Sequence, residues 1–269
     1  MFNRLVDLSL DAKDNKKIIT PPSDHDNTFG LEEGYQVYAG LDRRWRERGY
    51  RPVGRKIGFT NQVLWEEFDI HTPIWAYVYD QTYQMAEMGH AVVNLERMLT
   101  PRLEPELVLK VNDRIQAVDN HPEALIEAVD WVAIGFELVE CHYPNWELSV
   151  ADALADGVLH CKLVVGPPLM LDDASKSAMV ELLETFEVQL WRGSELIETG
   201  FGRNALGSPL KALAYLRDVL DSQSWPDPLQ GGEIITTGSL TSVPFILPGE
   251  TWSVEVSGLD LETLVMETE

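Results

Sequence analysis

The spacing of hydrophobic residues changes within the first sixty positions. Between Leu31 and Arg48 they recur every three or four residues, which predicts a helix with one buried face. Residues from Arg51 to Phe59 have the character of a short strand, and Thr60 then stands where the N-cap of a helix over residues 61–68 would lie. The N-terminal part is therefore predicted to be mainly helical, with one strand.

From Ile74 onward the hydrophobic runs are mostly short and extended, as in strands. Two helices are expected to interrupt them, over residues 122–131 and 209–220, the second opened by Ser208 as N-cap and Pro209 in the first turn. The predicted strands cover residues 91–95, 106–111, 132–141, 161–165, 188–191, 196–199, 233–237, 251–256 and 261–266. This pattern predicts an α+β fold, with an N-terminal helical region over residues 1–70 and a β-rich domain over residues 71–269.

The acidic composition of the 269-residue chain excludes some classes of binding partner. It has 21 Lys and Arg against 44 Asp and Glu, a formal net charge of −23. Such a surface repels phosphates, so we expect neither nucleic acid nor membrane as a partner.

No apolar run approaches the ~20 residues of a membrane-spanning helix, the first residues lack the apolar core of a signal peptide, and two cysteines fit a reducing compartment. We therefore expect a cytoplasmic protein.

Basic residues are concentrated near the N-terminus. Residues 1–60 hold 11 of the 21 basic side chains and only 9 of the 44 acidic ones. Most of this cluster is typical of a solvated helix face. Its last members, Arg55 and Lys56, are alternatively candidates for capture of an anionic substrate.

Three glutamates on two predicted strands are the strongest candidates for chemistry. Glu104 and Glu106 are two positions apart, so on a strand their side chains lie on the same face. Carboxylates this close repel each other unless a cation or a shared proton compensates them. Glu137 lies in an apolar stretch of another strand, where a buried carboxylate also needs a partner. The alternatives are a solvated strand edge and an oxygen-only site for Mg²⁺ or Mn²⁺.

Several short segments between Leu31 and the C-terminus also carry a family resemblance. Residues 55–61, RKIGFTN, resemble the motif YKIGLTS, and Glu104-Pro-Glu106 resembles a Glu-x-Glu pair. The other matching segments are residues 73–80, 136–140, 146 with 152–157, 207–216, 235–239 and 248–250. In this order they resemble the 2-keto-4-pentenoate hydratase and 4-oxalocrotonate decarboxylase branch of the fumarylacetoacetate hydrolase superfamily.

The resemblance implies a mixed β-roll, a bound Mg²⁺ or Mn²⁺ and a lyase of aromatic catabolism that hydrates or decarboxylates a small anionic 2-oxo acid or its enol. Glu104, Glu106 and Glu137 match the family's metal ligands, Lys56 its lysine and Asp80 its acidic residue near the substrate. A metal chelated by the carboxylate and the 2-oxo group would stabilise an enolate. A homodimer or larger assembly is also implied, and association with a pathway enzyme is compatible with it.

Three residues are candidates for proton handling and substrate positioning. We expect Lys56 and Asp80 to interact and to position the substrate or an attacking water, although by composition alone they read as a surface lysine and a turn aspartate. Leu159-His160 stands where the branch has paired serines. His160 is therefore either a general acid or base or a structural histidine at the start of a strand.

Two other function classes and one specificity feature stay open. A C–C hydrolase or tautomerase of the same superfamily could use His25 with a nearby glutamate on an N-terminal lid, and a non-catalytic relative would bind a metabolite or partner. Aromatic residues gather near the Lys56 to Asp80 segment, where they either form core or enlarge the pocket; they are Trp65, Trp75, Tyr77, Tyr79 and Tyr83.

Overall fold

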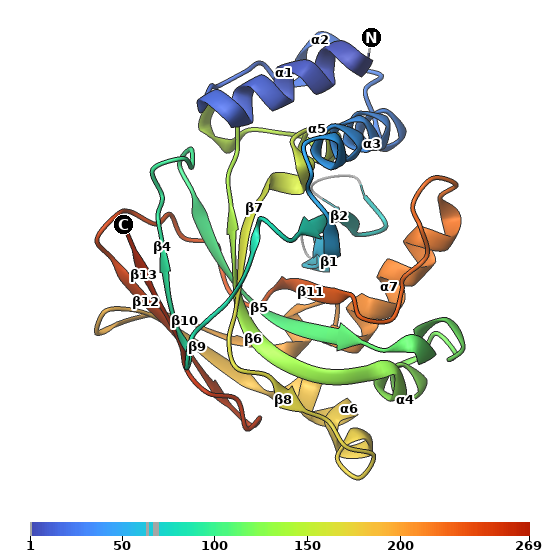
Figure 1. Ribbon diagram of the computed structural model, residues 1–269, viewed down its shortest axis with the longest axis vertical. Coiled ribbons are helices and arrows are strands. Elements are labelled where there is room, and N and C mark those ends of the chain that lie inside the picture. The colour runs from blue at the N-terminus through green and yellow to red at the C-terminus, as the bar shows by residue number, and fades with distance from the viewer. Residues whose placement is uncertain (1, 63–64, 67–69) are drawn as a thin grey trace.

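The computed structural model describes residues 2–62, 65–66 and 70–269. Helices near the N-terminus, together with α5, cover one end of a body made of two β-sheets (Figure 1). The α-helices are α1 (Phe2–Asn15), α2 (Pro22–His25), α3 (Leu31–Glu47), α4 (Pro122–Leu125), α5 (Val150–Ala155), α6 (Lys176–Thr185) and α7 (Pro209–Ser222). Among the described helices, none has the length and apolarity of a membrane span.

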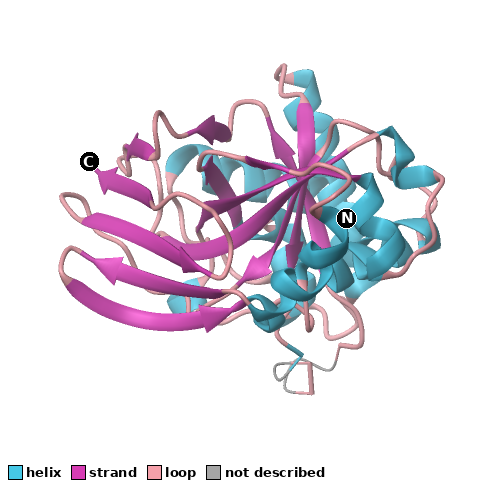
Figure 2. Ribbon diagram, turned by 90° about the horizontal axis from the view of Figure 1, so that it is seen from below, coloured by secondary structure: helices cyan, strands magenta, loops and turns pink. Residues whose placement is uncertain are grey.

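The body contains one eight-stranded and one five-stranded sheet (Figure 2). The larger runs in the order β2-β1-β11-β5-β6-β7-β3 with β8 beside β6, and the smaller in the order β10-β9-β12-β13-β4. Their bounds are β1 Pro52–Gly58, β2 Ile74–Tyr79, β3 Tyr83–Met85, β4 His90–Val93, β5 Arg102–Val111, β6 Val129–Val139, β7 His160–Val165, β8 Leu169–Met170, β9 Glu187–Arg192, β10 Glu195–Phe201, β11 Ile234–Ser239, β12 Thr251–Ser257 and β13 Leu264–Thr268. Parallel and antiparallel pairs occur in both sheets, which confirms the expected α+β fold.

Strands β5 and β6 form the long, curved centre of the larger sheet (Figure 1). They pair antiparallel, with Glu104 opposite Glu137 and Val111 opposite Val129. Most of their residues are buried apolar side chains, as in strands covered on both faces. The pairing also explains why the helix expected over residues 122–131 is short: α4 ends at Leu125, a 3₁₀ turn covers Ile126–Ala128, and the chain is then part of β6.

The expected domain boundary at residue 70 does not match the architecture. Strand β1 lies inside the larger sheet, antiparallel to β2 and parallel to β11, so Lys56 belongs to the β-body. The N-terminal helical part ends with α3 at Glu47. The helix expected over residues 61–68 falls largely on residues 63–64 and 67–69, which lie outside the described residues.

Two arginines of the basic cluster pair with helix α1, which the sequence pattern does not predict. Arg44 lies 2.7 Å from Asp7, and Arg48 lies 2.8 Å from Asp14, so arginines of α3 pair with aspartates of α1. Apolar side chains of α1, α3 and α5 fill the space between the helices; they include Val6, Leu10, Val37, Leu41 and Ala155. Arg44 and Arg48 therefore lie on a helix face, as expected, but this face is only partly solvated because it pairs with α1.

A largely buried ion cluster joins α1 to the β-body. The Lys13 ammonium lies 3.3 Å from Asp156 Oδ1 and 3.7 Å from Glu140 Oε1. Asp156 also accepts the backbone N–H of His142. Burial would raise the pKa of Asp156, but Lys13 and His142 outweigh it and the pKa is lowered. The folded state therefore favours an ionised Asp156.

We predict that Lys13→Met destabilises the fold by about 3 kcal/mol, because it leaves buried carboxylates without their cation. Lys17→Met, which removes the exposed pair with Asp11, should cost less than about 1 kcal/mol. Since the pKa of Asp156 is lowered on folding, its contribution should be present above its unfolded pKa of about 3.9 and fade at lower pH. Urea unfolding at pH 7 and pH 3.5 measures both effects; equal losses in the two variants would contradict this role of Lys13.

Candidate metal centre

Strand pairing brings the three predicted glutamates together on one face of the larger sheet. Glu104 and Glu137 are direct cross-strand partners, and Glu106 follows two positions later on the same face of β5. One carboxylate oxygen from each residue lies within 4.8 Å of the others. Glu106 and Glu137 are fully buried. The predicted convergence of these side chains is therefore present in the fold.

Each of the two fully buried carboxylates has one occupied and one free oxygen. Glu106 Oε2 accepts the backbone N–H of Gly238 at 2.6 Å, and Glu137 Oε1 accepts from Lys56 Nζ at 2.9 Å. Within the described part of the chain, Glu106 Oε1 and Glu137 Oε2 have no hydrogen-bond partner. A buried unsatisfied oxygen costs about 1–3 kcal/mol, more when charged. Free carboxylate oxygens facing the same small space fit the oxygen donor set of Mg²⁺ or Mn²⁺.

A bulge in β11 supplies the amide that holds Glu106. The register between β11 and β5 shifts between Thr236 and Ser239, and Gly238 there has a φ of 104°. A side chain at this position would be strained, and its Cβ would overlap the hydroxyl of Thr60. Glycine thus allows the backbone N–H to reach Glu106.

Lys56 alone does not compensate three ionised carboxylates in this cluster. Burial and the neighbouring carboxylates raise the pKa of Glu104 to about 7 and that of Glu106 well above its usual range. Burial opposes ionisation of Glu137 too, but Lys56 and His160 outweigh it and lower the pKa of Glu137 to about 2. Burial likewise opposes the charged form of Lys56, yet the carboxylates raise its pKa. One lysine for three carboxylates leaves room for a cation.

Lys56 reaches this cluster from a distant strand. β11 and β5 lie between its own strand β1 and the strand of Glu137, so the 2.9 Å contact closes across the concave side of a curled sheet. The side chain of Lys56 is only 4% exposed. The composition-based interpretation of a surface lysine is therefore wrong, and Lys56 lies where the family resemblance places it.

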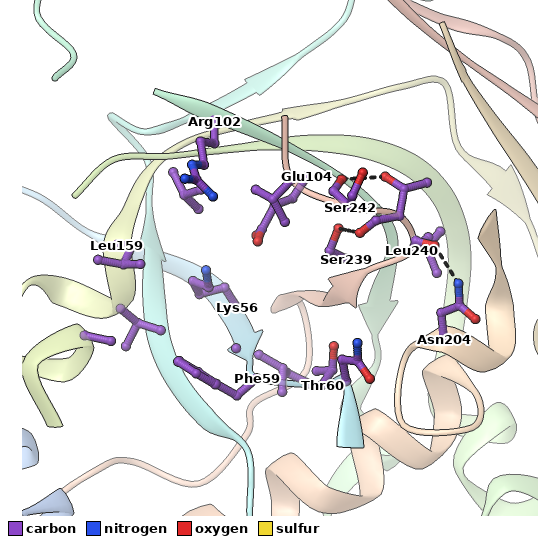
Figure 3. Close-up of a pocket in the computed structure, with 18 of the residues that line it drawn as sticks. Lys56, Phe59, Thr60, Arg102, Glu104, Leu159, Asn204, Ser239, Leu240 and Ser242 are labelled. Carbon is purple, nitrogen blue, oxygen red and sulfur yellow. Dashed lines mark hydrogen bonds between the residues drawn. The ribbon is translucent and has the colours of Figure 1, made fainter. Parts of the chain in front are cut away.

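A cavity of about 660 Å³ opens in front of the cluster (Figure 3). Lys56, Arg102 and Glu104 reach it from the sheet, and the loop after β11 forms the opposite wall. Its lining residues are Lys56, Ile57, Gly58, Phe59, Thr60, Asn61, Arg102, Glu104, Val139, Trp146, Ala153, Val158, Leu159, Glu198, Asn204, Ser239, Leu240, Thr241, Ser242 and Val243. None of the five aromatic residues considered for the pocket is in this lining; Trp75, Tyr77 and Tyr79 pack in the core.

His160 lies behind the cluster and not at the cavity wall. Its Nδ1 is 2.8 Å from Glu137 Oε1, and its Nε2 is 2.8 Å from the hydroxyl of Thr82. Both ring nitrogens are engaged, and the side chain is 5% exposed. Direct action of this histidine on a substrate stays a prediction; the geometry is that of a residue that orients Glu137.

Asp80 does not meet Lys56, contrary to expectation. It is exposed just beyond the end of β2, and its carboxylate accepts the backbone N–H of Arg51 at 3.0 Å. In the β1–β2 ladder Lys56 pairs with Ala76, so Asp80 lies at the far end of these strands. The turn interpretation of Asp80 is the one that fits. His25 is also exposed, on α2, and is not in the cavity lining.

Sequence reasoning missed several polar residues of the cavity. Arg102 comes two positions before Glu104 on the same strand face, a signal that the Glu-x-Glu pattern already contained. Glu198 accepts the backbone N–H of Ser242 at 2.7 Å, and Asn204 donates to the carbonyl of Leu240 at 2.8 Å. These contacts join β10 and the segment after it to the loop after β11. The local sequence pattern does not predict them.

Comparisons with known proteins identify the family of the chain. The model of the family "Fumarylacetoacetate (FAA) hydrolase C-terminal" matches residues 64–266, so the chain belongs to this family. It is 29% identical over 243 residues to 2-keto-4-pentenoate hydratase 1 of Dechloromonas aromatica strain RCB, covering 90% of this chain and 88% of the relative. It is 26% identical over 228 residues to a 4-oxalocrotonate decarboxylase of Pseudomonas putida, covering 84% and 82%.

Solved structures share the fold. The 4-oxalocrotonate decarboxylase of Pseudomonas putida G7, complexed with magnesium and adipate, superposes with a TM-score of 0.88 at 22% identity, over 100% of this chain and 97% of that one. The fumarylpyruvate hydrolase of Pseudomonas aeruginosa, in complex with Mn²⁺ and pyruvate, gives a TM-score of 0.56 at 14% identity, over 81% and 89%. The β-roll expected from the resemblance is thereby confirmed.

We predict that Glu106→Gln weakens Mn²⁺ binding by more than about 100-fold, because it replaces an anionic donor in the cluster. The metal-free variant should be no less stable than the parent, since one of three mutually repelling buried carboxylates is gone. Titration calorimetry and thermal unfolding test both statements, with the exposed Glu255→Gln on β12 as the matched control. Unchanged Mn²⁺ affinity in Glu106→Gln would exclude it as a ligand.

We predict that His160→Asn weakens Mn²⁺ binding by about 10- to 100-fold, the usual effect of removing a residue that orients a ligand. The affinity for Mn²⁺, measured by calorimetry, is the readout. His121→Asn, which changes an exposed histidine beside Glu123, should have no effect. A wild-type affinity in His160→Asn would show that Glu137 needs no such support.

Proposed function

We propose that this member of the fumarylacetoacetate hydrolase family is a divalent-metal-dependent lyase that hydrates or decarboxylates a small 2-oxo acid or its enol. The observation that carries the proposal is the cluster of three converging carboxylates with a buried lysine beside it, at the edge of a cavity. The hydratases and decarboxylases among its sequence relatives support the reaction class.

Glu104, Glu106 and Glu137 are the residues that would hold Mg²⁺ or Mn²⁺. One carboxylate oxygen of each lies within 4.8 Å of those of the other two, and both hard ions prefer carboxylate donors. When bound, such an ion supplies Lewis-acid polarisation of a substrate carbonyl and stabilises the negative charge of an enolate.

Lys56 brings a fixed positive charge to the same place. Its ammonium has three donors, of which the contact with Glu137 occupies one, and the residue lines the cavity. The remaining donors are placed to bind the substrate carboxylate or a developing negative charge. Its position thus favours two tasks: keeping Glu137 in place and holding the anionic end of the substrate.

Two sets of residues hold parts of the site in position without contacting the oxygens proposed to bind the metal. His160, held by Thr82, fixes the orientation of Glu137. The loop after β11 is stiffened by Ser239, whose hydroxyl donates to the carbonyl of Thr241 at 3.0 Å, and by Asn204. A preorganised polar wall of this kind holds its dipoles toward the substrate without reorganisation during the reaction.

The structure offers less support for the alternatives. A hydrolase that used a histidine and a glutamate on an N-terminal lid would need His25 near the cavity, and His25 is exposed on α2. A non-catalytic binding protein would need none of the buried ionic arrangement. A location in the cytoplasm and a homodimer or larger assembly, alone or with a pathway enzyme, stay predictions.

The proposal is tested by incubating the protein with Mg²⁺ and either 2-hydroxypenta-2,4-dienoate or 4-oxalocrotonate. We expect consumption of at least one substrate, followed by its ultraviolet absorbance, with CO₂ release marking decarboxylation. Chelation of the metal by EDTA should abolish the reaction, and added Mg²⁺ should restore it. Metal binding without turnover of either substrate would contradict the proposed activity and favour the non-catalytic alternative.

We predict that Lys56→Gln lowers kcat by about 100-fold or more, because it removes one preorganised charge next to the reacting group. Mn²⁺ binding should persist, because Lys56 is not a ligand and His160 still holds Glu137. Lys211→Gln, on the exposed side of α7, serves as the control in the same kinetic assay. A kcat within twofold of the parent value in Lys56→Gln would show that the lysine has no role in catalysis.

A further inference from the structure

Thr236 is a buried polar residue of β11 that the proposed reaction leaves unused. The residue is 0% exposed, and the described part of the chain gives its hydroxyl oxygen Oγ1 no hydrogen-bond partner. The next residue, Thr237, is buried to the same extent, but its hydroxyl donates to the carbonyl of Leu107 at 2.9 Å. A buried hydroxyl destabilises a fold unless another polar group satisfies it. The hydroxyl of Thr236 therefore indicates a further polar group in the space that it faces.

Strand register places Thr236 beside Lys56. The two residues are partners in the parallel β1–β11 pair, and on its other side Thr236 is paired with Val108 of β5. Partners in register have their side chains on the same face of a sheet. Val108 comes two positions after Glu106, so this face also carries the glutamates. Thr236 thus belongs to the concave side of the larger sheet, next to the metal centre.

The side chain of Lys56 crosses the strand of Thr236 on its way to Glu137. Strands β11 and β5 separate β1 from β6 in the sheet, yet the Lys56 ammonium lies 2.9 Å from Glu137 Oε1. A side chain that reaches across two strands first passes over the neighbouring one, and Thr236 is the residue of β11 in register with Lys56. The Thr236 hydroxyl consequently lies beside the path of the lysine side chain.

The Lys56 ammonium has more N–H groups than its carboxylate partner uses. It carries three, and among the described residues Glu137 is the one carboxylate within 4 Å. The lysine side chain is only 4% exposed, so bulk water does not serve the other two N–H groups. Glu106 Oε1, on the same face, also lacks a partner within the described chain. A hydroxyl, an ammonium and a carboxylate oxygen thus surround one small space.

We propose that Thr236 is a positioning residue for Lys56, acting through one water molecule buried between the Thr236 hydroxyl, the Lys56 ammonium and Glu106 Oε1. The water accepts an N–H of the ammonium and donates to the two oxygens. Buried waters typically make about three hydrogen bonds to polar groups that are otherwise unsatisfied, and these three groups meet that requirement. When Glu106 Oε1 binds a cation instead, Thr236 and Lys56 still hold the water.

The water determines where the last N–H of Lys56 points. Glu137 takes one N–H group and the water takes a second, so the third is directed to the cavity that Lys56 lines. An ammonium on a flexible four-carbon stem has no such fixed direction by itself. Thr236 is not among the residues that line the cavity, so it acts on a bound anion only through Lys56. The inference rests on the proposed function for this task of Lys56.

The test uses Thr236→Val, which removes the hydroxyl from a β-branched side chain, and Thr236→Ser, which keeps it. Oxalate is titrated by calorimetry into the full chain with saturating Mn²⁺. We expect Thr236→Val to weaken oxalate binding by about five- to tenfold, as for loss of one water-mediated hydrogen bond. Thr236→Ser should bind oxalate within about twofold of the parent affinity. The affinity for Mn²⁺ itself should change by less than about twofold in both variants, because Thr236 is not a ligand.

Crystal structures of the metal-free parent and of Thr236→Val locate the water itself. The parent should have one ordered water within about 3.2 Å of both Thr236 Oγ1 and Lys56 Nζ, and the variant should have none there. The matched control is Thr251→Val, which changes an exposed threonine at the start of β12 and should leave oxalate binding unchanged.

Three results would overturn the proposal: no water at this position in the parent, unchanged oxalate binding in Thr236→Val, or equal weakening in Thr236→Val and Thr236→Ser. The last result would assign Thr236 to packing alone. A parent protein that turns over neither 2-hydroxypenta-2,4-dienoate nor 4-oxalocrotonate would instead refute the proposed function, and the water in the crystal would still decide this inference.

Discussion

Three carboxylates lie side by side on two paired strands, two of them fully buried, and the rest of the site depends on this constraint. Strand register alone places Glu104, Glu106 and Glu137 on one face, and their repulsion in a low-dielectric interior has to be compensated. The curl of the larger sheet brings Lys56 to Glu137, and the bulge at Gly238 turns an amide to Glu106. The oxygens that remain free define the place for a divalent cation.

The N-terminal helices are connected to this site through one turn. Gly157, Val158 and Leu159 have positive φ values of 69°, 53° and 61°, a conformation that a β-branched residue rarely adopts. The turn places Val158 and Leu159 in the cavity wall, and the next residue is His160, behind Glu137. Asp156 begins the turn and is held by Lys13 of α1. The ion cluster that fastens α1 therefore also supports the strained segment beside the metal centre.

The local sequence pattern predicted helices, strands and part of the candidate site. The other contacts of the site depend on pairing between strands that are distant in the sequence. Periodicity located α3 and α7 closely, because their apolar faces meet the core, and it placed Glu104 and Glu106 on one face. The family resemblance added Lys56, whose buried contact with Glu137 depends on sheet curl. Asp80 lies at the far end of β1 and β2 from Lys56, and His160 contacts Glu137 behind the cavity. The motifs did not indicate these placements, because a motif reports position along the chain and not which side of a strand end faces the cavity.

The residues of the cavity wall could not be predicted from the sequence either, because they meet through long-range contacts. Arg102 contacts Trp146 and Phe245, which both come from segments more than forty residues further along the chain. Their convergence follows from the path of the loops and not from any local motif. Such residues distinguish members of a family that share the same ligand set, because they contact the part of a substrate that varies.

The central claim is that one oxygen from each of the three glutamates binds a divalent cation that also holds a 2-oxo acid. A crystal structure with Mn²⁺ and oxalate, an analogue of the chelating end of such an acid, tests it most directly through anomalous scattering. The account predicts one manganese peak coordinated by Glu104, Glu106 and Glu137, with both oxalate carboxylates in its coordination sphere. A manganese ion bound elsewhere, or a cluster that stays empty at millimolar Mn²⁺, would contradict it.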